Sequence, residues 1–271
     1  LTETAAVLAT ATGADMEFAG ALLARTMNAF SASLDGATNA AGELLTEEEK
    51  TVGVANVLAR AANDSALSMA QLGDAMQYVS PLAVAAGVSL QESVSMVAAL
   101  SNMGFNASRA GTAIAQALEA LTAPSKGAAE AMASIDFTAF DEQGKMKEMG
   151  QILVELKDRL GQLATDEEKL MVMQEMFGTR AGRAMNALMN DTEQYSNLLA
   201  SLAQDSEEGL NLIAQANEAM MKSVAGQTSI LQGSLEDLRM SIMSALEPLL
   251  VNEEGSGLLQ VLNDLFSNPE I

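Results

Sequence analysis

Four short polar sequences at the starts of apolar stretches constrain the fold of this chain more than any other feature. In each, a Ser or Thr is followed three residues later by Glu or Gln. This spacing is typical of the capping box, in which the two side chains bind free backbone N–H groups at a helix N-terminus. They predict an array of capped helices of about ten to fifteen residues each. The four pairs are Thr46 and Glu49, Ser68 and Gln71, Ser89 and Glu92, and Thr165 and Glu168.

The composition of the apolar residues also favours helices. Hydrophobic residues make up 49% of the chain, which is well above the content of disordered acidic proteins. Aromatic residues contribute only 3%, whereas Met alone occurs 18 times. Ala, Leu and Met form helices readily but build a light, adaptable core. We therefore predict an all-α fold of many short helices, with one long C-terminal helix.

The chain contains no Cys and no His, and this absence excludes several kinds of chemistry. It rules out a Ser-His-Asp triad, a Cys nucleophile, a disulfide framework and an ordinary zinc site. The sequence also has no calcium loop of alternating acids around a Gly, and no Gly-rich phosphate loop before a Lys. We therefore expect no catalytic residues, no metal, no cofactor and no enzymatic activity.

The charge is strongly negative, with 36 acidic and 14 basic side chains and a formal net charge of −22. Residues 1–125 carry a net charge of −8, residues 126–183 carry −3, and residues 184–271 carry −11. Binding to a phosphate backbone needs Lys and Arg to displace counterions. We therefore expect no specific binding of nucleic acid, and an acidic surface that favours solubility.

Changes in composition along the chain predict four parts. Residues 1–125 form an N-terminal helical array, and residues 126–190 contain a β-hairpin and amphipathic helices. Residues 191–250 form the long helix, and residues 251–271 form a short helix that continues into a longer chain. The first residue, Leu1, stands in mid-pattern without an initiator Met. We therefore expect the chain to be an excerpt of a longer polypeptide.

Helical periodicity is interrupted once, near residues 137–147. Phe137 and Phe140 bracket a β-prone run, and residues 141–144 offer turn chemistry, with Gly144 free to take a positive φ. The pattern predicts a single small β-hairpin. An amphipathic helical stripe returns directly after it, starting at Met149.

Residues 75–118 are almost entirely uncharged, with Glu92 and Arg109 as the exceptions. Pro, Gly or Ser interrupts each apolar run before it reaches the ~18–20 residues that span a bilayer, so this region holds no resting transmembrane helix. Two interpretations stay open: a buried helical hairpin, or a hairpin that enters a membrane after a large rearrangement. The candidate membrane-active residues are Val84, Val94, Val97 and Leu100.

Apolar residues near the C-terminus recur every eleven positions. Eleven residues over three turns is close to the natural helical repeat, so this pattern indicates a straight or slightly right-handed packing seam. A continuous helix over residues 206–247 would be about 60 Å long. The seam packs either within one chain or between copies around an axis. Its residues are Leu202, Ile213, Met220, Val224, Leu231, Leu235, Ile242 and Leu246.

Five short motifs occur in an order that is typical of one family. They lie at residues 73–81, 102–113, 121–126, 140–146 and 176–182, and residues 9–30 look similar to the family upstream of them. Together they resemble the core region of phage tail tape-measure proteins of the lactococcal siphophage type. The resemblance covers roughly residues 1–250. It is interrupted by an insertion-like stretch over residues 34–51, and the acidic C-terminal third is less typical of the family.

Several residues in these motifs also suit structural roles. Gly104 and Gly111 suit a helix stop and a close packing point between helices. Pro81 is expected to punctuate a helix, because it lacks an N–H group and disfavours helical backbone before it. Phe177 followed by Gly178 is expected to act as an aromatic anchor and a break.

The resemblance implies a structural virion protein that lies in the tail-tube lumen or at the baseplate, after synthesis in the bacterial host cytoplasm. Such a protein sets the length of the tail tube during assembly and leaves ahead of the DNA on infection. It implies contacts with copies of itself, as a trimer or hexamer, with the tail tube protein, with baseplate hub proteins, with tail assembly chaperones and with the host membrane during ejection.

Two other functions remain as alternatives at this point. The first is a membrane-inserting helical protein that acts in envelope penetration, which liposome leakage by the chain would support. The second is a helical scaffold, either of a tail-like injection particle or of a cellular adhesin. The genes beside this one would distinguish the scaffold of a cell from a tail protein.

Overall fold

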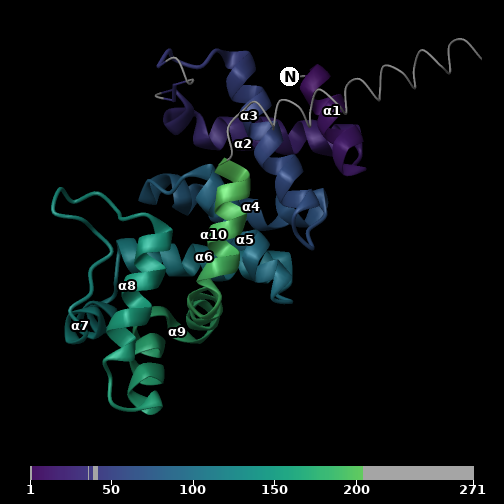
Figure 1. Ribbon diagram of the computed structural model, residues 1–271. Helices are drawn as coiled ribbons and strands as arrows, with labels where there is room; N and C mark the ends of the chain where they lie inside the picture. The colour runs from purple at the N-terminus through teal and green to yellow at the C-terminus, as the bar shows by residue number, and fades with distance from the viewer. Residues whose placement is uncertain (1, 36, 39–41, 204–271) are drawn as a thin grey trace, which may run out of the picture. The chain divides into compact units, whose positions relative to one another are not determined.

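The computed structural model describes residues 2–35, 37–38 and 42–203. These residues contain ten α-helices and no β-strand, so the all-α prediction is confirmed (Figure 1). The helices are α1 (Thr2–Thr12), α2 (Met16–Leu34), α3 (Glu47–Asn63), α4 (Met69–Ala86), α5 (Leu90–Asn102), α6 (Ala107–Thr122), α7 (Lys126–Ser134), α8 (Met149–Gly161), α9 (Asp166–Asn190) and α10 (Thr192–Ala203). Of the predicted long helix over residues 191–250, only the part up to Ala203 lies among the described residues.

All four predicted capping boxes are present, at the starts of α3, α4, α5 and α9. At the start of α3, the Thr46 hydroxyl accepts a hydrogen bond from the Glu49 N–H at 3.2 Å. The Glu49 carboxylate in turn accepts from the Thr46 N–H at 2.8 Å. Three further helices begin at a single capping side chain, from Asp15, Asn106 or Ser125. Local sequence therefore sets where most of these helices begin.

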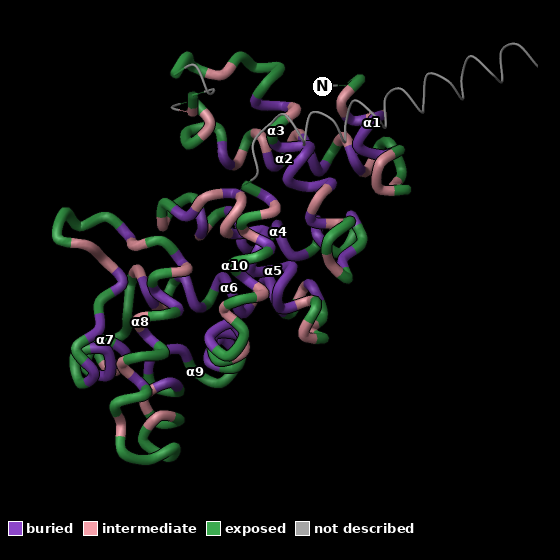
Figure 2. Tube along the Cα trace, viewed as in Figure 1, coloured by how far each residue is buried: buried purple, intermediate pink, exposed green. Residues whose placement is uncertain are grey.

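The centre of the fold is formed by α4, α5 and α6, with α3, α9 and α10 packed around them. Figure 2 shows buried residues gathered along these central helices. The axes of α4 and α6 approach closely at Gly111, where an added Cβ would lie 2.5 Å from the Ala75 carbonyl oxygen. The predicted close packing point at Gly111 is confirmed. Gly104 takes a φ of +86° directly after α5, so the predicted helix stop is confirmed as well.

Pro81 does not end a helix, and this prediction is wrong. Helix α4 runs through it from Met69 to Ala86. Proline removes the hydrogen bond to the carbonyl group four residues earlier, which belongs to Gln77. Gln77 and Pro81 both lie on the exposed side of α4, where water can bind that carbonyl group, and the opposite side of the helix is buried in the core.

The described residues do not form the predicted β-hairpin. The chain reverses direction at the predicted turn, where Gly144 takes a φ of +77° and its N–H donates to the Asp141 carbonyl at 3.1 Å. Pairing across the turn is limited to one isolated antiparallel bridge between Phe140 and Met146. The Asp141 carboxylate holds the turn itself by accepting from the Lys145 N–H at 2.8 Å. Two backbone bonds also cross the turn, from the Asp141 N–H to the Lys145 carbonyl at 2.8 Å and from the Lys147 N–H to the Ala139 carbonyl at 2.9 Å. The reversal is therefore held by backbone and side-chain bonds together, without extended strands.

One carboxylate joins the starts of two helices. Glu92 completes the capping box of α5 by accepting from the Ser89 N–H at 3.1 Å and from its hydroxyl at 2.8 Å. Its other oxygen accepts from the Met149 N–H, at the first residue of α8, at 2.8 Å. Glu92 is one of the two charges in residues 75–118, and in the fold its carboxylate binds the N–H group of Met149, which lies 57 positions away in the chain.

Tyr195 of α10 is the largest fully buried side chain in the described residues, with an exposed fraction of 0%. Its hydroxyl oxygen has no hydrogen-bond partner among those residues. Burial raises the pKa of Tyr195 well above its usual value of about 10, and the nearby charges of Glu92 and Glu148 add to this effect. Ionised Tyr195 is therefore disfavoured in the folded state.

We expect Tyr195→Phe to leave the protein as stable or to stabilise it by up to about 1 kcal/mol at pH 7, because it removes a buried hydroxyl without a partner. Since the folded state keeps Tyr195 protonated, the free energy of unfolding of the native protein should fall as the pH rises above about 10. In the Tyr195→Phe variant, the free energy of unfolding should not show this alkaline decline. Urea unfolding of both proteins between pH 8 and 11, in a Tyr78→Phe background, measures it. An equal alkaline decline in both would contradict the prediction.

Candidate interaction site

Helix α9 is bent at Gly178, and this bend creates a concave surface in the described part of the chain. Gly178 has φ 67° and ψ −179°, in the region that favours glycine, so the helix is interrupted between Phe177 and Thr179. Phe177 is buried, with 7% of its surface exposed. The predicted aromatic anchor and break are both confirmed.

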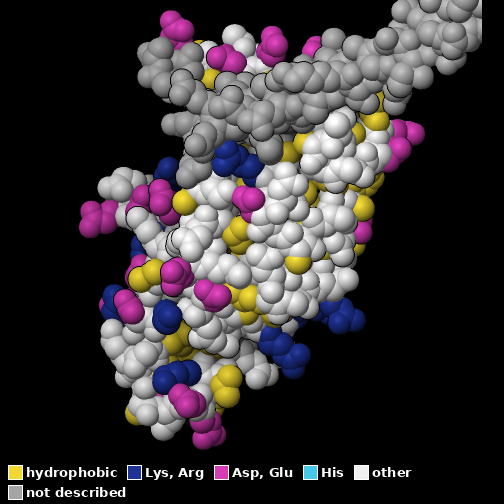
Figure 3. Space-filling model, turned by 45° about the vertical axis from the view of Figure 1, so that its right-hand side comes forward, with side chains coloured by type: hydrophobic (Ala, Val, Ile, Leu, Met, Phe, Trp, Pro, Cys, Tyr) yellow, Lys and Arg dark blue, Asp and Glu magenta, His cyan; other side chains and the backbone are white. Residues whose placement is uncertain are grey.

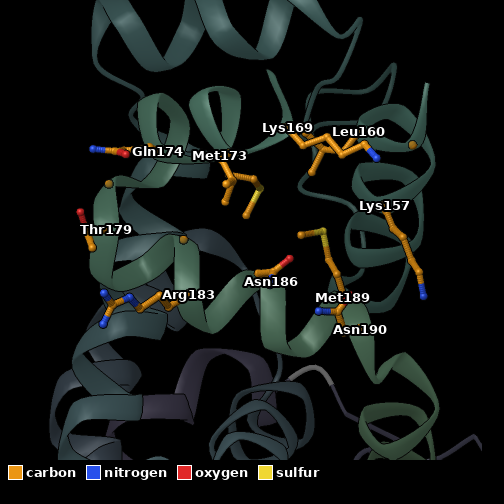
Figure 4. Close-up of a pocket in the computed structure, with 14 residues that line it drawn as sticks. Lys157, Leu160, Lys169, Met173, Gln174, Thr179, Arg183, Asn186, Met189 and Asn190 are labelled. Atoms are coloured by element: carbon orange, nitrogen blue, oxygen red, sulfur yellow. The ribbon is translucent and has the colours of Figure 1, made fainter. Parts of the chain in front are cut away.

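The first hollow lies inside the bend. Its walls are the two halves of α9 and the end of α8. We call it the α9 groove, and its volume is about 400 Å³. Met173 and Met189 extend into it from the two halves of α9, with Asn186 between them (Figure 4). Leu160 of α8 completes an apolar floor, and Leu170 lies at its edge with 70% of its surface exposed.

A second hollow of about 810 Å³ lies beside the first, between α9 and the start of α6. It shares Thr179 and Arg183 with the α9 groove. Its other lining residues come mainly from two of the sequence motifs, residues 102–113 and residues 176–182. These motifs are about 70 positions apart in the chain, and the fold places them on one surface.

Basic side chains surround both hollows, and no Asp or Glu of the described part lines either of them. Lys169 binds Asp166 at 2.9 Å, and this hydrogen bond lowers the pKa of the Asp166 carboxyl group below its usual value. The guanidinium groups of Arg109, Arg180 and Arg183 are exposed and make no ion pair with any described residue. The lining bases are Lys157, Lys169, Arg109, Arg180 and Arg183.

This concentration of positive charge stands out in a chain with 36 acids and 14 bases. On the face drawn in Figure 3, dark-blue and magenta side chains are mixed along one edge, but the lower right shows dark blue without magenta beside it. The apolar floor is bordered by Lys157, Lys169 and Arg183, of which only Lys169 makes an ion pair with a described residue, and such a surface suits binding of an acidic, partly apolar partner. No group of three or more Asp and Glu residues that could hold a metal ion occurs in the described part of the chain.

The structure does not bring the predicted membrane-active residues onto one surface. Val94, Val97 and Leu100 are fully buried in α5, whereas Val84 of α4 is 38% exposed. Among the described helices, none alone is long and apolar enough to span a bilayer. Only α1 and α2 taken together reach that length and composition, and they meet at an angle of 117°. Membrane entry by residues 75–118 stays a prediction.

The predicted packing seam falls mainly outside the described residues. Its first residue, Leu202, is buried near the end of α10, with 4% of its surface exposed. The other seven residues, from Ile213 to Leu246, lie beyond Ala203 and outside the described part. The role of the seam also stays a prediction.

Sequence reasoning did not identify the arginines of the two hollows as a site. Arg109 was noticeable only as a rare charge in an apolar region, and Arg180 lies within the motif around Gly178. The sequence offered one indication of this site: two of the five family motifs, residues 102–113 and 176–182, each contain an Arg. Their proximity depends on the packing of α6 against α9, which no local pattern reveals.

Comparison with known proteins agrees with the resemblance seen in the motifs. A tape measure protein of Pneumococcus phage Dp-1 is 26% identical over 203 residues, which is 75% of this chain and 17% of that protein. A probable tape measure protein of Escherichia phage P2 is 32% identical over 146 residues, which is 52% of this chain and again 17% of the relative. The chain thus spans about a sixth of the length of these curated relatives.

No solved structure matches the chain. The model of the phage-related minor tail protein family matches residues 1–178, about two thirds of the sequence. The predicted relationship to phage tail tape-measure proteins is confirmed by this match and by the names of the two relatives. This chain belongs to the phage-related minor tail protein family.

Proposed function

We propose that this chain is a segment of a tape-measure protein that sets the length of the tail tube during assembly and leaves ahead of the DNA on infection. The observation that carries the proposal is the family match together with two relatives named as tape measure proteins. The all-α fold supports it, because each helical residue adds a fixed rise of about 1.5 Å and a long helical chain can therefore act as a ruler.

We further propose that the described residues form a compact module within that ruler. Ten helices of 9 to 25 residues pack against one another here, so this part spans far less length per residue than one continuous helix would. We place the module in the virion, in the tail-tube lumen or at the baseplate. Its proposed partners are copies of itself as a trimer or hexamer, the tail tube protein, baseplate hub proteins, tail assembly chaperones and the host membrane during ejection.

Tail length measures the proposed function directly. In-frame deletions within the complete gene, placed in its extended helical part, should shorten the tail by about 1.5 Å for every residue removed. Duplication of the same segment should lengthen the tail by the same amount, and this serves as the matched control. Electron micrographs of negatively stained particles give the lengths. Tails of unchanged length in both variants would refute the proposal.

A further inference from the structure

We propose that the second hollow, between α9 and the start of α6, binds an acidic knob on another copy of this chain. We call this hollow the arginine hollow. The acidic knob is the exposed segment at the start of α3 that contains Glu43, Leu44, Glu47 and Glu48. The inference rests on the self-association proposed above and names two surfaces that make it. It is tested on the purified chain in solution, whereas the ruler is tested on the tails of particles, so the two proposals can fail separately.

The arginine hollow combines positive charge with apolar surface. Arg109 of α6 lines it together with Arg180 and Arg183 of α9, and no Asp or Glu of the described part does. The three side chains are exposed and make no ion pair with any described residue. Met103 and Phe105 are half-buried in its wall. A partner that fits this hollow therefore carries carboxylates beside an exposed apolar side chain.

Arg183 extends away from the floor of the α9 groove. Figure 4 shows its guanidinium group and the Thr179 side chain on one side of α9, away from Met173 and Met189. Thr179 and Arg183 also line the arginine hollow. A carboxylate in the arginine hollow can therefore meet Arg183 without entering the apolar α9 groove.

The acidic knob carries the complementary groups. Leu44 is 67% exposed, although it is a large apolar side chain. Glu43 precedes it, Glu47 and Glu48 follow it within one turn of chain, and all three are exposed. Arg binds carboxylates through paired, charge-assisted N–H bonds, which favours these partners over neutral ones. An exposed Leu among carboxylates is thus the counterpart of an apolar wall among guanidinium groups.

The knob is held in place by bonds at its base. Leu44 forms an isolated antiparallel bridge with Thr38. Lys50 joins the end of α2 to the start of α3 by binding Asp35 at 2.7 Å and Glu47 at 2.8 Å. A segment that is already ordered loses less conformational freedom on docking, so more of the contact energy appears as affinity.

The separation of the two surfaces points to a second copy as the source of the knob. Figure 1 shows the segment before α3 near the top of the described part and α9 in its lower part. A different hollow lies beside the knob, lined by Thr38, Leu45 and Glu48 among others, and it shares no residue with the arginine hollow. A chain therefore cannot place its own knob in its own hollow while these helices stay packed. A contact between unlike surfaces of successive copies generates a ring if it closes, which suits the proposed trimer or hexamer.

Charge reversal on each surface tests the contact. The hollow variant, Arg109→Glu with Arg180→Glu, should weaken self-association of the 271-residue chain by about tenfold or more, as measured by sedimentation equilibrium at low salt. The knob variant, Glu43→Arg with Glu48→Arg, should weaken it similarly. A chain that carries all four substitutions should associate again, because the two surfaces have exchanged their charges. A native chain that stays monomeric, or a fourfold variant that does not regain association, would overturn the proposal.

Each variant has a control with the same change in net charge at exposed positions outside the two surfaces. Arg25→Glu with Lys145→Glu is matched to the hollow variant. Glu3→Arg with Glu17→Arg is matched to the knob variant, and both of these acids also lie in the first turn of a helix. The controls should associate within about twofold of the native chain. A loss in the controls equal to that in the variants would show a general effect of net charge and overturn the proposed contact.

A further pair of variants tests the apolar part of the knob without changing any charge. Leu44→Ser should weaken association by about tenfold or more, because it removes the apolar side chain that the hollow receives. Met16→Ser is the control, since Met16 is also exposed, at 47%, and stands beside an acid, Glu17. Circular dichroism establishes that each variant keeps its helix content. Equal association of the two variants would overturn the assignment of Leu44 to the contact.

Disulfide cross-linking identifies which chain supplies the knob. The protein has no native Cys, so pairs of introduced cysteines report single contacts. Ser108 lines the arginine hollow, and a mixture of Leu44→Cys chains and Ser108→Cys chains should give a covalent dimer on oxidation, which non-reducing electrophoresis detects. A mixture of Met16→Cys and Ser108→Cys chains should give none. If a chain carrying both Leu44→Cys and Ser108→Cys closes an internal loop instead, the knob belongs to the same copy and the proposal is wrong. No cross-link in the first mixture would also refute it.

Discussion

Gly111→Val should lower the free energy of unfolding by about 3 kcal/mol or more, which is near the upper end for overpacked cores. A Cβ at position 111 would lie 2.5 Å from the Ala75 carbonyl oxygen and 2.8 Å from the Ala75 Cα. Both atoms belong to the backbone of α4, so the clash is relieved only if α4 and α6 move apart. Chemical denaturation of the purified chain in urea measures the loss.

Gly53→Ala is the matched control for this substitution. Gly53 lies inside α3, and an added Cβ at that position would meet no atom within 4 Å. Ala favours a helix over Gly by about 1 kcal/mol, so Gly53→Ala should stabilise the protein by up to that amount. If Gly111→Val lowers the free energy of unfolding and Gly53→Ala raises it, Gly111 is required for the close approach of α4 and α6. A neutral Gly111→Val variant would show that α4 and α6 do not pack at this distance.

Glu92→Ala should cost about 2 to 3 kcal/mol of unfolding free energy. The carboxylate accepts hydrogen bonds at the start of α5 and from the Met149 N–H at the start of α8. Hydrogen bonds to a charged group contribute about 1.5 to 3 kcal/mol where they are partly buried, and loss of one helix cap costs about 1 kcal/mol. Its removal therefore weakens two helix starts at once.

Glu168→Ala is the comparison for the Glu92 variant. Glu168 also completes a capping box, but within the described part of the chain its carboxylate accepts only from Ala164 and Thr165, next to its own helix. The expected cost is about 1 kcal/mol. Thermal or urea unfolding of both variants gives the difference. Equal costs would indicate that the bond from Glu92 to α8 contributes nothing to stability.

The features that the sequence predicted correctly are those decided by neighbouring residues. Each capping box is completed by side chains three positions apart, so all four were recognisable without knowledge of the fold. The break at Gly178 was likewise predictable, because few residues other than Gly tolerate a positive φ. The close approach at Gly111 was suggested by the absence of a side chain, although the sequence did not identify Ala75 as its partner.

The features that sequence reasoning missed depend on contacts between distant residues or on exposure. Pro81 remains inside α4 because it lies on the exposed side of that helix, which a local rule for proline does not consider. The α9 groove needs α8 packed against both halves of a bent helix, and the adjacent hollow places Arg109 near Arg183. The sequence separation of these two arginines conceals their proximity.

The capping boxes have a consequence for how fast the chain folds. Because each box is completed within four residues, a helix start is specified before any distant segment arrives. Helices form in about 0.1–1 μs, and helical proteins rich in local contacts are among the fastest to fold. The described part has no sheet whose strands must find their register. A chain built in this way, once pulled out to full extension, regains its helices first and needs only to repack them.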